Sequence, residues 1–150
     1  MRRDRIANEK IIDFFVPASR TVGTHTSGVF DLRQGGSGEG PGREIIENMM
    51  LMITVGATWG GTNTITITVN TGDTSTVTAY ATIAAMSAAE SQDLYLAELK
   101  SLQRYIQLSV VLTGTTLFSI LGSGNRSRRE PVIQLGTEKT VTYSRTPATG

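Results

Sequence analysis

The feature that most constrains the fold is the stretch from Thr62 to Ile83, TNTITITVNTGDTSTVTAYATI, in which threonine occupies almost every second position. Successive side chains of a β-strand point to opposite faces, so Ile65, Ile67 and Val69 share one face and the threonines between them share the other. Threonine fits the pleated surface through its β-branch, and its hydroxyl bonds water or a cross-strand neighbour. The stretch therefore predicts a strand with one apolar and one polar face.

A turn and a second strand are expected after this one. Residues 70–75, NTGDTS, are turn-forming side chains, and the alternation of apolar and polar residues resumes at Val77. We expect the apolar face of the first strand to be core. Its polar face, with Thr64, Thr66 and Thr68, is expected to be open to solvent.

Alternation returns near the end of the chain. Residues 104–112, RYIQLSVVL, predict a central strand. Its buried face is expected to carry Ile106, Leu108, Val110 and Leu112. A turn at 113–115 leads to a strand over 117–121, which the GSGN sequence of residues 122–125 is expected to end.

The first third of the chain predicts shorter extended pieces, over 11–16 and 21–32. In the second piece Val29, Phe30 and Leu32 are expected to be buried. Residues 33–42, RQGGSGEGPG, are half glycine and predict a loop, because glycine in a sheet loses entropy and packs nothing.

Two segments are ambiguous between helix and strand. Residues 44–58 contain IIENMMLM, which could open a helix, but MLMITV favours a buried strand, and the break at 59–61 predicts a hairpin with the Thr-rich strand. Residues 84–102 have the best helical composition in the chain, yet polar residues interrupt the stripe that a helix would bury. One or two short helical turns within a loop are expected there.

Many short strands separated by turn signals, with no long amphipathic helix, predict an all-β sandwich or barrel-like roll. At 150 residues the chain fits one domain. Residues 1–10 are mostly charged or polar and predict an N-terminal arm. The β domain is then expected over 11–124, with a C-terminal extension over 125–150.

Composition narrows the possible functions. The formal net charge is +1, which favours neither nucleic acid nor a membrane as partner. The chain has no cysteine, so disulfides and thiolate metal sites are excluded. No apolar run approaches the roughly 20 residues of a membrane span, and the amino end does not have the pattern of a signal peptide.

Residues suited to catalysis are few. His25 is the single histidine, lies in the polar sequence THTSG, and is expected to be a solvated loop residue. Asp31, Asp73 and Asp93 are far apart in sequence and are expected to be caps or solvated side chains. The Gly-rich loop at 33–42 fits no phosphate-binding motif. The sequence thus predicts no enzyme, no catalytic residue, no metal site and no cofactor.

Two other features could serve in binding. The basic run RSRRE at residues 126–130 could touch nucleic acid or an acidic protein face, or be solvated. Trp59, beside two glycines, could stack on a sugar, but tryptophan more often anchors a hairpin or a subunit contact.

The order of motifs resembles a known family. A short FDL segment, a Gly-rich loop and MMLMITV precede GATWGGTNTITITV, AAMSAA and RYIQLSVVLTGT, over roughly residues 8–122. This order resembles the jelly-roll capsid cement, or decoration, proteins of tailed bacteriophages. The resemblance implies an antiparallel jelly-roll-like β-sandwich and a homotrimer that clamps neighbouring subunits of the major capsid protein on the outer capsid surface. Synthesis in the host cytoplasm and assembly into the virion would follow.

The inert Thr-rich face suits such a displayed, soluble role. Trp59 is the candidate for the oligomer interface. The candidates for capsid contact are the basic residues near the two ends of the chain, Arg2, Arg3, Arg5, Lys10, Arg126, Arg128 and Arg129. The alternative is a jelly-roll module of a phage tail or baseplate that binds carbohydrate or another tail protein.

Overall fold

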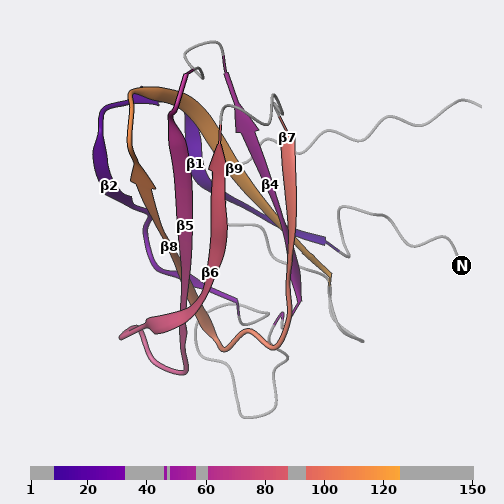
Figure 1. The fold of residues 1–150 in the computed structure, drawn as a ribbon. Coiled ribbons are helices and arrows are strands. Elements are labelled where there is room, and N and C mark those ends of the chain that lie inside the picture. Colours follow the sequence, from indigo (N-terminus) through magenta and orange to yellow (C-terminus); the bar gives the residue numbers. More distant parts are fainter. Residues whose placement is uncertain (1–8, 33–45, 47, 57–60, 88–93, 126–150) are drawn as a thin grey trace, which may run out of the picture.

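The computed structural model describes residues 9–32, 46, 48–56, 61–87 and 94–125, and these contain strands and no helix (Figure 1). The strands are β1 (Glu9–Arg20), β2 (Gly23–Thr26), β3 (Phe30–Asp31), β4 (Met49–Val55), β5 (Thr64–Gly72), β6 (Thr78–Ser87), β7 (Leu94–Leu99), β8 (Tyr105–Leu112) and β9 (Thr116–Asn125).

The strands form two antiparallel sheets. Sheet A has the order β1-β9-β4-β7, and sheet B has the order β2-β8-β5-β6, with β3 also pairing with β8. The pairs β1–β9, β2–β8, β4–β7 and β5–β6 are nested, as if one long hairpin had been folded over into two layers. That nesting is the jelly-roll arrangement, so the predicted all-β, jelly-roll-like sandwich is confirmed.

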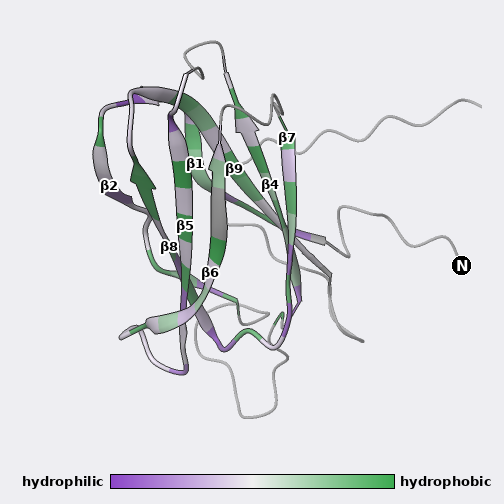
Figure 2. Cartoon of the chain, viewed as in Figure 1, coloured by the Kyte–Doolittle hydropathy of each residue, from purple (hydrophilic) through white to green (hydrophobic). Residues whose placement is uncertain are grey.

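The Thr-rich strand behaves as its sequence predicts. Ile65, Ile67 and Val69 are fully buried, whereas the threonines of β5 that alternate with them are partly exposed. Figure 2 shows the same alternation of apolar and polar residues along β5. The expected turn and second strand follow, because β6 pairs with β5. Strand β8 is the central strand expected over 104–112.

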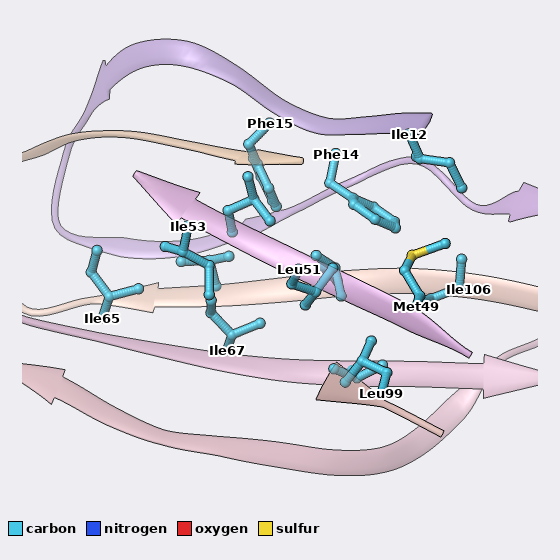
Figure 3. Close-up of a cluster of buried hydrophobic side chains, with 14 of the residues drawn as sticks. Ile12, Phe14, Phe15, Met49, Leu51, Ile53, Ile65, Ile67, Leu99 and Ile106 are labelled. Carbon is cyan, nitrogen blue, oxygen red and sulfur yellow. The ribbon is translucent and has the colours of Figure 1, made fainter. Parts of the chain in front are cut away.

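The core lies between the sheets and draws side chains from both (Figure 3). Leu51 and Ile53 of β4 meet Ile65 and Ile67 of β5 in the cluster that Figure 3 draws. At the other end of the core the rings of Phe14 and Phe30 lie edge to face, with centroids 5.2 Å apart. Each such pair stabilises the fold beyond its buried area.

Strand β9 continues to Asn125, past the glycines that were expected to end it. Gly122 and Gly124 face the interior, where a Cβ atom at Gly122 would lie 2.6 Å from Met49 and from Phe14. The glycines therefore make room for large neighbouring side chains and do not break the strand.

The expected hairpin between the MLMITV strand and the Thr-rich strand is wrong. Strand β4 pairs with β7 and β9 in sheet A, whereas β5 pairs with β6 and β8 in sheet B. Strands β4 and β5 thus follow one another in the sequence but lie in different sheets. A short sequence break cannot distinguish a hairpin from such a crossing, because both need a turn.

The expected helical turns within 84–102 are also wrong where the chain is described. Residues 84–87 belong to β6, and β7 covers Leu94–Leu99. In β7 the residues Tyr95, Ala97 and Leu99 face the core, which is the period of a strand. Pairing with β4 outweighs the helical propensity of this composition.

Burial in the first third of the chain follows the prediction in part. Leu32 is fully buried and Phe30 packs against the core, but Val29 is 40% exposed. Val29 lies in the short interruption between β2 and β3, where the backbone N–H of Ser27 donates a hydrogen bond to the Leu108 carbonyl of β8 at 2.9 Å. The Ser27 Oγ atom accepts a hydrogen bond from the backbone N–H of Leu108 at 2.9 Å.

Candidate interaction surfaces

The outer face of sheet B is broad and uncharged over three rows of directly paired residues. Residues directly opposite each other in a ladder share a face. The rows are Thr24–Val111–Thr66, Thr26–Ser109–Thr68–Thr82 and Gln107–Asn70. Hydroxyl and amide groups dominate this surface, which offers hydrogen bonds but no charge.

An ion pair stands at one end of this face. Arg104 donates from Nε to Asp31 Oδ1 at 3.0 Å and from Nη2 to Asp31 Oδ2 at 2.7 Å, and its guanidinium lies 4.9 Å from the ring centroid of Tyr105. Asp31 is thus not the isolated carboxylate that its sequence context predicts. The two residues are 73 positions apart, so no local signal could have revealed the pair.

The other two aspartates singled out in the sequence are Asp73 and Asp93. Asp73 Oδ2 accepts a hydrogen bond from Gln103 Nε2 at 3.1 Å, within the turn region after β5. Asp93 lies outside the described residues.

The outer face of sheet A has the opposite chemistry. Its rows are Ile11–Ser123–Met50–Glu98, Asp13–Leu121–Met52–Leu96 and Ser119–Thr54–Leu94. Leu96 is 61% exposed, Leu94 56% and Met50 40%. An apolar surface that runs across neighbouring strands is typical of an interaction site, unlike single scattered apolar residues.

A groove of about 490 Å³ separates the edge strands β1 and β2. Its lining includes Arg20, whose guanidinium lies 5.1 Å from the ring centroid of Phe15 and 4.7 Å from that of Phe118. Arg20 also donates hydrogen bonds to the carbonyls of Val16, Ala18 and Phe118. Through these contacts the Arg20 guanidinium links the end of β1 to β9.

His25 lines the same groove but lies in a strand and not in the expected loop. It belongs to β2, is partly exposed, and its Nε2 atom lies 2.8 Å from the Thr21 carbonyl oxygen. Among the described residues, no group of three or more histidine, aspartate or glutamate side chains is placed to hold a metal ion.

The residues that the sequence proposed for binding are mostly outside the described part of the chain. This holds for Trp59 and for the basic residues Arg2, Arg3, Arg5, Arg126, Arg128 and Arg129. Lys10 differs from the expectation, because it lies in β1 opposite Gly124 and is only 4% exposed. The strand starts at Glu9, within the arm predicted over 1–10, and a buried Lys10 offers little surface to a capsid.

The apolar face of sheet A was the main feature that sequence reasoning missed. The sequence predicts short helical turns within 84–102, the segment that contains Leu94 and Leu96, and it does not distinguish the outward-facing residues of β4 from the inward ones without the strand partners. The signal that could have found this face is the alternation LYLAEL over residues 94–99.

No helix in the described residues has the length and hydropathy needed to cross a membrane.

The sequence matches no known protein family, and no curated protein matches it. The fold is similar to that of a solved structure, PBSX exported protein XepA, with a TM-score of 0.55 and 12% sequence identity. The match covers 89% of this chain and 43% of that one, so this chain spans less than half of the similar protein, and the likeness shows a shared fold.

Proposed function

We propose that this chain is a structural virion protein that binds the outer surface of a phage capsid and stabilises it by clamping adjacent subunits of the major capsid protein. The observation that carries the proposal is the exposed apolar outer face of sheet A, with Leu94 and Leu96 more than half exposed, because such a face indicates a chain that works within an assembly. A surface of that kind favours a lasting protein partner. The fold likeness to XepA, a phage-related protein, supports a phage context.

The two outer faces suit two sides of a cement protein. The hydroxyl-rich face of sheet B has no net charge in its three rows and resists aggregation, as a surface displayed in many copies must. The apolar face of sheet A is suited to a permanent interface, whose centre is depleted of charged residues. We assign the partners as the major capsid protein and further copies of the chain itself, in a homotrimer.

The basic residues near the two ends are the proposed lattice contacts. Arg2, Arg3 and Arg5 precede β1, and the run from Arg126 follows β9. Charge pairing with acidic grooves between capsid subunits would orient the protein and fix its register. Such contacts weaken as salt screens them.

Cosedimentation tests the proposal. The full-length chain is mixed with undecorated capsids of its phage and pelleted, and the ratio of this chain to the major capsid protein is measured by gel densitometry. We expect saturable binding at a fixed ratio with many copies per particle. An absence of binding, or a handful of copies per particle, would overturn the capsid role, and the second result would point to a tail or baseplate module.

A further inference from the structure

We propose that the outer face of sheet A is the surface through which copies of this chain associate, with three such faces meeting around one axis. The inference rests on the homotrimer of the proposed function and adds the surface that forms it. It starts from the central row, in which Leu96 lies opposite Met52 and Met52 lies opposite Leu121. Apolar side chains thus run without a break across three strands.

The neighbouring rows extend this patch. Met50 flanks it on β4 and Leu94 flanks it on β7, and both are at least 40% exposed. Between the apolar residues stand small hydroxyl side chains, Ser119, Ser123 and Thr54. Thr54 is exposed and Ser119 and Ser123 are partly exposed, so a partner surface would bury this face further.

Charge selects the kind of partner. The two central strands carry no charged residue in these rows, and the acids stand at the two edges, Asp13 on β1 and Glu98 on β7. Glu98 already lies 3.5 Å from the Lys100 ammonium. A strongly basic or acidic partner would meet no opposite charge at the centre of this face. Another copy of the same face supplies apolar side chains in the middle and hydroxyl groups around them.

The size of the face sets how much of the contact it can supply. Strands lie about 4.8 Å apart, so the four-stranded sheet A is about 19 Å wide. Seven residues of strand span about 23 Å, so the flat area of the face is about 400 Å². A standard interface buries about 800 Å² per partner. The sheet face would supply the apolar centre, and its rim would supply the remainder.

Sedimentation of the full-length chain in solution tests this assignment without capsids. The wild-type chain is compared with Leu96→Glu, which places a charge in the proposed contact, and with Thr68→Glu, which places the same charge on the outer face of sheet B. We expect wild type and Thr68→Glu to sediment with the mass of three chains. Leu96→Glu should sediment with the mass of one, with an unchanged circular dichroism spectrum.

A second substitution guards against misfolding. If Leu96→Glu loses its β spectrum, Leu96→Ser tests the same contact with a smaller change. It should raise the concentration needed for association at least about tenfold, which for a trimer corresponds to a loss of about 2.8 kcal/mol per trimer, or about 0.9 kcal/mol per chain. A wild-type monomer would overturn the proposal, and so would a Leu96 variant that associates like wild type. A dimer would overturn the threefold arrangement.

The capsid experiment separates this inference from the proposed function. If the wild type is a trimer that Leu96→Glu dissociates, but it does not bind capsids, the association surface stands and the capsid role is wrong. If the wild type is a monomer that binds capsids at a fixed ratio, the capsid role stands and the association surface is wrong, because the shell would then cover the outer face of sheet A.

Discussion

The outer faces of the two sheets differ at their centres. The inner strands of sheet B carry Thr66 and Thr68 on the outer face, whereas the inner strands of sheet A carry Met52 and Leu121. Both faces follow the same alternation, and both lie over the same core. Alternation decides which residues point outward, but not what surrounds them. An outward position therefore becomes a solvent surface or a contact surface through its residue type.

The largest effect is expected directly beneath the hydroxyl-rich face. Ile67→Ala removes a fully buried side chain and should lower the free energy of unfolding by about 2–5 kcal/mol. Thr66→Ala, the adjacent outward position, should lower it by about 1 kcal/mol or less. Denaturant unfolding measures both values. Equal losses would mean that the outer face of sheet B is covered in the assembled protein and is not a solvent surface.

A smaller effect is expected where a hydroxyl is buried. Ser27 is buried, and its Oγ atom accepts the backbone N–H of Leu108, so Ser27→Ala should cost about 1–3 kcal/mol by leaving that donor unpaired. The matched control is Ser109→Ala, at an outward position of the same strand pair, for which we expect about 0.5 kcal/mol or less. Similar losses from the two serines would show that the outward hydroxyls also serve the fold.

A change on the outer face of sheet A should depend on protein concentration. If this face is buried between copies, the thermal midpoint of the wild type rises with concentration, because association favours the folded state. Met52→Ser should lower the midpoint and weaken this dependence, whereas Thr68→Ser should change neither. Calorimetry over a range of concentrations measures this. A wild-type midpoint independent of concentration would contradict the contrast between the faces.

The smallest effect on the free protein is expected at its basic arm. Because β1 begins at Glu9, deletion of residues 1–8 removes Arg2, Arg3 and Arg5 and leaves the strand intact. Unfolding and the sedimenting mass should be unchanged, since the apolar face does not depend on charge. Attachment to capsids should weaken, and the salt dependence of attachment should become shallower. Unchanged capsid binding would move the lattice contact to the segment from Arg126.

The fold could be predicted further than the surfaces could. The strands at Met49–Val55, Thr64–Gly72 and Tyr105–Leu112 follow from local alternation, and the resemblance supplied the jelly roll that the ladder order confirms. The strand Leu94–Leu99 was missed because its composition also suits a helix, and pairing with β4 decided between the two. The end of β9 was missed because glycine in a sequence does not reveal which neighbours fill its space.

The sequence by itself determined which residues could lie on the buried side of each alternating strand, because the period of two is a local property of the backbone. Which strands are neighbours depends on the folded chain as a whole, because ladder hydrogen bonds join residues far apart in the sequence. That pairing joined Asp31 to Arg104, placed Lys10 inside the sandwich and aligned Met52 with Leu96 and Leu121. The apolar face of sheet A exists through this alignment, since three separate segments contribute to one row.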